Sequence, residues 1–166
     1  MAPLVVVSPG SRSKIEELIL KKNELRYIIF KIEGSQIVVD AAVTSPMMKL
    51  PKDEFKDNSR AAYDYFLTDL RNRTNDFSDP RFTVFNFKFS CHLPGEGVTN
   101  LEKILFFKFI PDKAPIKTKM LYDSAIPTMK SALDSGKVRE IMINVVSEFE
   151  HSEMLTKLIN NVCVPH

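Results

Sequence analysis

Residues 114–133, with the sequence APIKTKMLYDSAIPTMKSAL, decide the fold because their apolar side chains recur at helical spacing. Wound at about 100° per residue, this segment becomes a helix with one clear core-facing stripe. The stripe consists of Leu121, Tyr122, Ala125, Met129, Ala132 and Leu133. Such a stripe predicts a long helix packed on a sheet or on another helix.

Met120 departs from this pattern, because the same spacing places it opposite the core stripe, with Lys117 and Lys119 on either side. An exposed thioether between two cations suits a protein-binding anchor, since methionine adapts to irregular pockets and lysines attract an acidic partner. Single exposed apolar residues are also common on ordinary protein surfaces. The spacing by itself leaves both interpretations open.

The rest of the chain alternates between helical and strand patterns. Ser8 and Pro9 predict the start of a first helix, and Asn58 or Ser59 can cap a second. The further elements expected in chain order are strands at 25–32 and 36–43, a surface excursion at 44–57, a helix around 62–70, strands at 82–89 and 104–110 separated by a loop at 91–100, the long helix, a strand at 138–146 and a helix at 151–160.

Two of these strands differ in pattern. Residues 82–89 alternate strictly, with phenylalanines on one face and Asn86 and Lys88 on the other, which predicts a strand covered mainly on one side. Residues 104–110 are almost continuously apolar and predict a central strand covered on both faces.

The order of elements is satisfied by a single α/β domain over residues 1–166. Its centre is expected to be a five-stranded mixed β-sheet flanked by helices on both faces. A chain of 166 residues with 44% hydrophobic residues can bury a sizeable core in one domain.

Composition argues against several partners and locations. A net charge of +2, without a run of basic and aromatic residues, gives no reason to expect nucleic-acid binding. No segment is apolar over the length of a bilayer, and the apolar run at 4–7 is too short for a signal peptide, so we expect a cytosolic protein. In that compartment Cys91 and Cys163 are expected to be reduced thiols.

The sequence offers no catalytic or metal-binding motif. It lacks a glycine-rich phosphate loop, a paired-cysteine motif, a His-Glu-x-x-His zinc helix and a Gly-x-Ser-x-Gly elbow. We therefore expect no metal, no cofactor and no enzymatic activity.

The run KILFF at 103–107, followed by PDKAPIKTKMLY at 111–122, closely resembles the central signature of the ADF/cofilin family, the actin-depolymerising factors. Supporting matches are RYIIF at 26–30, RFTVFNF at 81–87 and MKSAL at 129–133. The resemblance spans nearly the whole chain. It implies a mixed α/β domain that binds actin monomers and filaments, prefers the ADP-bound subunit and severs or depolymerises filaments in the cytoplasmic actin cytoskeleton. A monomeric protein is expected.

Carried over by position, the resemblance places Lys117 and Lys119 as basic contacts to actin and Met120 as the apolar residue that enters a cleft of the monomer. The segment at 5–8 corresponds to the family's N-terminal arm. The expected monomer-binding residues are Val5, Val6, Val7, Ser8, Lys117, Lys119, Met120, Ser124 and Lys130.

The filament-binding surface of the family is a basic strand-loop-strand projection with charged residues on the last helix. Here the resemblance leaves Lys103 on the projection and Lys157 on the last helix, with Thr156 and Asn160 at positions where charges are expected. We therefore predict strong binding to monomers and weaker filament binding and severing, since lost rim charges weaken attraction to an acidic partner. Lys or Arg at positions 96 and 101 should increase cosedimentation with filaments.

Two further departures concern regulation and helix shape. The regulatory phosphoserine of the family falls at Ala2-Pro3, where no hydroxyl exists, so control by that route is not expected. Pro127 lies inside the long helix and leaves the carbonyl of Asp123 without its helical partner.

Alternative roles within the same fold remain open at this point. One is a monomer-sequestering protein with little severing activity, and another is a partner of a branching complex, against which the intact motif at 117–120 argues. A third is phosphoinositide binding through Lys113, Lys117, Lys119 and Lys130, which would compete with actin.

Overall fold

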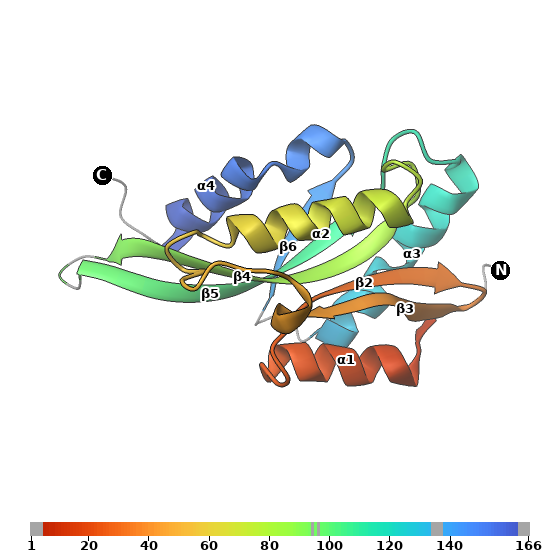
Figure 1. Cartoon of the computed structure of the whole chain (residues 1–166). Coiled ribbons are helices and arrows are strands. Elements are labelled where there is room, and N and C mark those ends of the chain that lie inside the picture. Colours follow the sequence, from red (N-terminus) through yellow and green to blue (C-terminus); the bar gives the residue numbers. More distant parts are fainter. Residues whose placement is uncertain (1–4, 94, 96, 134–137, 163–166) are drawn as a thin grey trace.

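A six-stranded mixed β-sheet forms the centre of the computed structural model, which describes residues 5–93, 95, 97–133 and 138–162 (Figure 1). The strands lie in the order β1-β3-β2-β4-β5-β6. In chain order the elements are β1 (Val6–Val7), α1 (Pro9–Ile19), β2 (Leu25–Glu33), β3 (Gln36–Thr44), the 3-10 turn η1 (Ser45–Met47), α2 (Arg60–Arg73), β4 (Arg81–Leu93), β5 (Gly97–Phe109), α3 (Ile116–Leu133), β6 (Val138–Ile143), the 3-10 turn η3 (Val146–Phe149) and α4 (His151–Val162).

The α/β class is confirmed, but the sheet has one strand more than the sequence predicted. Strand β1 pairs in parallel with β3, with Val6 beside Gln36 and Val7 beside Ile37. The expected number of five strands was wrong because two residues are too few to show the alternation by which a strand is recognised. The inner pairs are antiparallel, and β6 returns parallel to β5.

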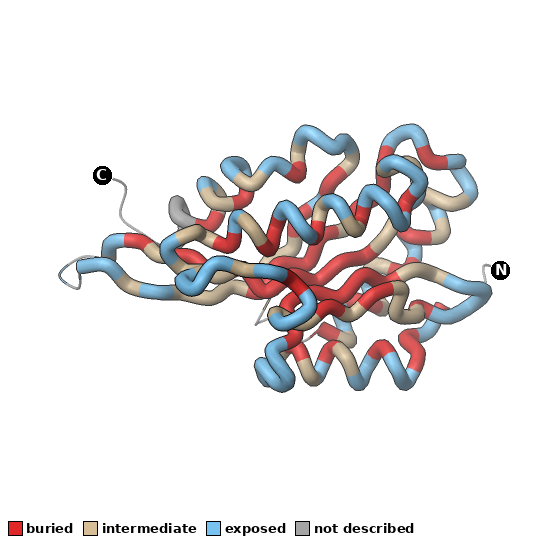
Figure 2. Tube along the Cα trace, viewed as in Figure 1, coloured by how far each residue is buried: buried red, intermediate tan, exposed pale blue. Residues whose placement is uncertain are grey.

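Helices cover both faces of the sheet, as predicted. One buried cluster joins the sheet to α1 and α3, and a second joins the other face to α2 and α4. Figure 2 shows the buried residues running along the strands between these helical layers.

Strand β4 is buried on both faces along its first half. Phe82 and Val84 belong to the cluster under α1 and α3, whereas Phe85 and Phe87 belong to the cluster under α2 and α4. The expected one-sided cover was wrong here. The alternating phenylalanines marked one buried face, but the other face is also apolar where α1 and α3 pack against it.

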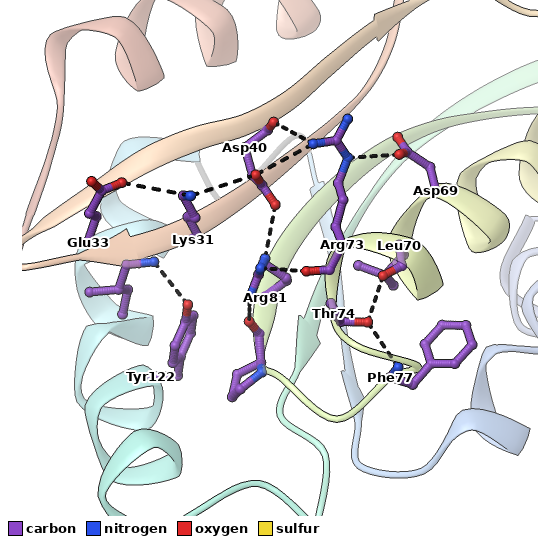
Figure 3. A network of polar contacts seen from close by, with 12 residues as sticks. Lys31, Glu33, Asp40, Asp69, Leu70, Arg73, Thr74, Phe77, Arg81 and Tyr122 are labelled. Carbon is purple, nitrogen blue, oxygen red and sulfur yellow. Dashed lines mark hydrogen bonds and ion pairs between the residues drawn. The ribbon is translucent and has the colours of Figure 1, made fainter.

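Asp40 on β3 joins three elements at one edge of the sheet (Figure 3). Its carboxylate accepts a hydrogen bond from Nε of Arg81 on β4 over 3.1 Å. The same carboxylate lies 3.5 Å from Nη1 of Arg73 at the end of α2. On helix α3, the hydroxyl of Tyr122 accepts the N–H of Ile32 over 2.9 Å, and this bond fixes the orientation of α3 against β2.

The predicted loop at 91–100 was mostly wrong. Strands β4 and β5 stay paired from Arg81 beside Phe109 as far as Leu93 beside Gly97. The glycines and polar residues favoured a loop locally, but paired strands satisfy their backbone groups with each other whatever side chains they carry. The result is a long hairpin that projects beyond the helices (Figure 1).

Cys91 lies near the end of this hairpin and is disulfide-bonded in the structure. The expectation of a reduced thiol was therefore wrong for Cys91. That expectation used only the cysteine number, the chain size and the compartment, whereas disulfide formation depends on how closely two thiols approach in the fold. The predictions made for Ala2, Pro3, Cys163 and position 96 concern residues outside those described.

Ser59 stands at the start of α2, as predicted, but does not cap the helix with its side chain. Its hydroxyl accepts the N–H of Lys88 and donates to the carbonyl of the same residue, each over 2.8 Å. The carboxylate of Asp57 accepts the N–H of Ala61 instead, over 2.9 Å.

Within the described parts of the chain, no helix has the length and apolar character needed to cross a bilayer.

Candidate functional site

Helix α3 carries the candidate site on the side that faces away from the sheet. Tyr122, Ala125, Met129 and Leu133 are buried against the sheet, whereas the side chain of Met120 is 65% exposed. The outward direction that the helical spacing predicted for Met120 is therefore confirmed. Its contact with a partner remains a prediction.

Ile116 is a second exposed apolar residue on this helix, and the sequence argument missed it. It precedes Met120 by one helical turn and is 70% exposed. Residues four apart lie on the same face of a helix, so the two side chains form one apolar patch. The signal was present in the sequence, since the same spacing that singled out Met120 applies to Ile116.

Three lysines surround this patch. The ammonium of Lys119 donates to the carbonyl of Asp112 over 3.1 Å, and that of Lys113 donates to the carbonyl of Asp76 over 3.3 Å. Lys117 is exposed, one residue beyond Ile116. Because an ammonium has three donors, bonds to single carbonyls leave Lys113 and Lys119 able to bind an acidic group as well.

Ser124 and Lys130 lie further along α3. Ser124 is exposed, and its hydroxyl donates to the carbonyl of Leu121 over 2.7 Å. The ammonium of Lys130 lies 3.4 Å from a carboxylate oxygen of Glu140 on β6. Lys130 is thus held toward the sheet by an acidic neighbour.

The segment that precedes α3 is anchored to the turn after β6. The N–H of Asp112 donates to the carbonyl of Asn144, and the Asn144 amide donates to the carbonyl of Ile110, each over 3.0 Å. The carboxylate of Glu148 accepts the N–H groups of Asn144 and Val145, also over 3.0 Å each. These bonds fix where α3 begins and therefore where Ile116 and Met120 project.

The N-terminal segment lies beside α3 but is mostly buried. Val5, Val7 and Ser8 are 5%, 5% and 8% exposed, whereas Val6 is 42% exposed. Strand β1 lies next to α3. Of these four residues only Val6 exposes its side chain, and a contact of any of them with a partner remains a prediction.

The side chain of Ser8 makes contacts within the fold. Its hydroxyl oxygen accepts the N–H of Ser11 over 3.1 Å and thereby caps α1, as the sequence predicted. The hydroxyl of Ser11 in turn donates to the carbonyl of Ile37 on β3 over 2.9 Å. These two serines tie the start of α1 to the sheet.

The two residues predicted to bind filaments lie on β5 and α4 rather than on α3. Lys103 is half-buried on β5, beside Phe87 of β4. Lys157 on α4 lines a groove of about 410 Å³ whose other charged residues are Glu148, Glu150 and Glu153. Figure 1 shows the β4–β5 hairpin extending to the left, while the start of α3 lies at the right of the molecule. Lys103 and Lys157 therefore lie on other elements than the patch formed by Ile116 and Met120 on α3.

Pro127 occupies an exposed position in α3, and the helix continues through it from Ile116 to Leu133.

Among the described residues, no group of three His, Cys, Asp or Glu side chains is placed to hold a metal ion. The chemistry available at the α3 surface is thus apolar contact flanked by positive charge.

Comparisons with known proteins agree on one family. The family model described as cofilin/tropomyosin-type actin-binding protein matches residues 4–159. Actin-depolymerizing factor 1, isoforms a/b, of Caenorhabditis elegans is 38% identical over 155 residues, which cover 93% of this chain and 73% of that protein. Cofilin of Schizosaccharomyces pombe is 35% identical over 156 residues, covering 93% and 94%. The solution structure of the ADF-like UNC-60A protein of Caenorhabditis elegans aligns with a TM-score of 0.79 and 39% identity, covering 95% of this chain and 96% of that one.

Proposed function

Because this chain belongs to the cofilin/tropomyosin-type family of actin-binding proteins, also called ADF/cofilin, we propose that it binds actin monomers through the exposed face of α3 and promotes filament depolymerisation. We also propose that residues 1–166 act as one domain, as a monomer, in the cytoplasmic actin cytoskeleton. The protein performs this role by binding alone, without catalytic turnover.

One observation carries the proposal. Met120 and Ile116, one helical turn apart, are exposed on α3, whereas Tyr122, Met129 and Leu133 on its other face pack into the core. Apolar anchors inside a rim of cations are typical of binding hot spots for an acidic protein surface. Lys113, Lys117 and Lys119 supply that rim.

Binding to filaments is proposed to be weaker than binding to monomers. Lys157 shares its groove with three glutamates, and Lys103 is half-buried. Carboxylates around a cation lower the positive potential that an acidic filament would meet. This local charge balance supports weak severing, and it gives the monomer-sequestering alternative a specific basis.

Phosphoinositide binding through Lys113, Lys117, Lys119 and Lys130 is a second proposed activity of the same surface. All four lysines lie on α3 or on the segment before it, so an anionic membrane would compete with actin for them. Flotation with liposomes that contain phosphoinositide, compared with neutral liposomes at two salt concentrations, tests this activity.

The central experiment measures the two actin interactions side by side. Native-gel binding to ADP-loaded and ATP-loaded monomers is compared with cosedimentation on filaments. We expect clear monomer binding, tighter for the ADP-loaded form, and weaker cosedimentation. A seeded pyrene-actin assay then separates sequestration from severing, since only severing increases the number of filament ends. Absence of monomer binding would refute the proposed function.

A further inference from the structure

Glu140 on β6 contacts two lysines from different elements. Its Oε1 lies 3.4 Å from Nζ of Lys108 on β5, and its Oε2 lies 3.4 Å from Nζ of Lys130 in the last turn of α3. The side chains of Lys108, Glu140 and Lys130 are 17%, 28% and 44% exposed. One carboxylate therefore holds an inner lysine and an outer lysine, and only the outer one is readily reached by a partner.

The contact with Lys130 is weak enough to be exchanged. A charge-assisted hydrogen bond between an ammonium and a carboxylate has a length of about 2.7–2.9 Å, shorter than the separation found here. Partly exposed ion pairs contribute little to stability because water screens them. An acidic group of a partner can thus replace Glu140 at Lys130, but it must first overcome the attraction that Glu140 exerts.

We propose that Glu140 lowers the affinity of the α3 surface for actin monomers, because it reduces the attraction of Lys130 for acidic groups on the monomer. The inference rests on the proposed function. The carboxylate acts through the lysine: the negative charge of Glu140, 3.4 Å from the ammonium of Lys130, offsets part of the positive charge that Lys130 would present to an approaching acid. The chain thereby sets the strength of its monomer contact at the end of α3 through an acidic residue on the adjacent strand.

The substitution Glu140→Gln tests this assignment because it keeps the shape of the side chain and removes its charge. At low salt we expect the variant to bind ADP-loaded monomers about two- to fivefold more tightly than the unchanged protein, the range expected for a partly exposed ion pair. The gain should shrink at high salt, since screening weakens charge interactions between exposed groups. In a Lys130→Gln background the same substitution should change affinity by less than about 1.5-fold, because the group that it releases is gone.

A control variant isolates the effect of position from that of net charge. Glu17→Gln removes the same charge from α1, where Glu17 lies 3.0 Å from Lys14, and should leave monomer affinity unchanged. Thermal unfolding checks that each variant is folded. Should Glu140→Gln fail to fold, Glu140→Asp draws the carboxylate back from Lys130 and should give a smaller gain of the same sign.

The outcomes distinguish the two proposals. If the unchanged protein binds no actin monomer, the proposed function fails and this inference fails with it. If the unchanged protein binds, then equal or weaker binding by Glu140→Gln overturns this inference and leaves the proposed function standing. Such a result is expected if the ion pair only fastens α3 to the sheet. An equal gain from Glu17→Gln, or a gain that persists without Lys130, overturns the inference as well.

Discussion

The ammonium of Lys119 donates a hydrogen bond to the backbone carbonyl of Asp112, 3.1 Å away, across the first turn of α3. This bond draws the lysine back toward the segment that precedes the helix, next to exposed Ile116. The positive charge is thereby held at the border of the apolar patch. A side chain held in one orientation loses less conformational entropy when a partner binds, which favours affinity.

Replacing Met120 by alanine should weaken monomer binding by about 2 kcal/mol, or roughly 30-fold, because truncated interface anchors cost about that much. Stability should hardly change, since the side chain is 65% exposed. Fluorescence titration of labelled monomers measures the affinity, and urea unfolding measures the stability. Met129→Ala is the matched control, because Met129 is fully buried and its loss should cost about 2–5 kcal/mol of stability. Unchanged affinity in Met120→Ala would remove the basis of the proposed function.

Replacing Ser8 by alanine should lower the free energy of unfolding by about 1 kcal/mol, because the N-cap of α1 is lost. Monomer affinity of the folded variant should stay within about twofold, because the buried side chain of Ser8 offers little surface to a partner. Urea unfolding and monomer titration on the same preparation provide both numbers. A large loss of affinity at unchanged stability would instead assign Ser8 to the contact surface.

Replacing Pro127 by alanine should raise the free energy of unfolding by about 1–3 kcal/mol. Alanine restores the N–H that the carbonyl of Asp123 lacks, and proline is the least favourable residue inside a helix. Pro127 is exposed, so no core contact is lost. Ser131→Ala, at another exposed position of α3, is the control for helix propensity alone and should give less than about 1 kcal/mol. A loss of stability in Pro127→Ala would indicate that the native helix depends on the proline geometry.

Replacing Glu153 by glutamine should increase the fraction of protein that sediments with filaments, by about twofold at low salt. The substitution removes one of the negative charges that line the groove beside Lys157. The difference should fade at high salt because of screening. Glu17→Gln on α1 again controls for net charge. Equal sedimentation of Glu153→Gln and the unchanged protein would argue that the α4 groove does not face the filament.

Replacing Lys21 by glutamine should lower stability at neutral pH and have less effect below about pH 4.5. Burial tends to raise the pKa of Glu102, but hydrogen bonds from Lys21 and Asn86 outweigh it and keep that pKa below its ordinary value of 4.5. A carboxyl whose pKa is lowered on folding stabilises the protein above the unfolded pKa, and this contribution is lost as the pH falls through the folded pKa. Urea unfolding at pH 7 and pH 3 measures the difference. An equal effect of the substitution at both pH values would contradict this assignment.

Much of the architecture could be predicted from local patterns. The periodic apolar residues of α3 fixed which side of the helix is buried, and the same periodicity identified α1, α2 and α4, because helix and strand periods differ. Two features escaped that reasoning. Strand β1 has two residues, and the end of the β4–β5 hairpin is rich in glycine and polar residues, so neither carries a period long enough to recognise.

For the candidate site too, some features follow from spacing within one segment and others only from contacts between segments. Sequence by itself determined that Met120 is exposed between lysines, because helical geometry depends only on spacing within one segment. Tertiary structure alone decided that Val5, Val7 and Ser8 are buried, that Glu140 holds Lys130 and that glutamates surround Lys157. Each of these relationships joins residues through the pairing of strands or the docking of a helix on the sheet. Contacts between such segments follow from the packing of the whole chain, which no local pattern encodes.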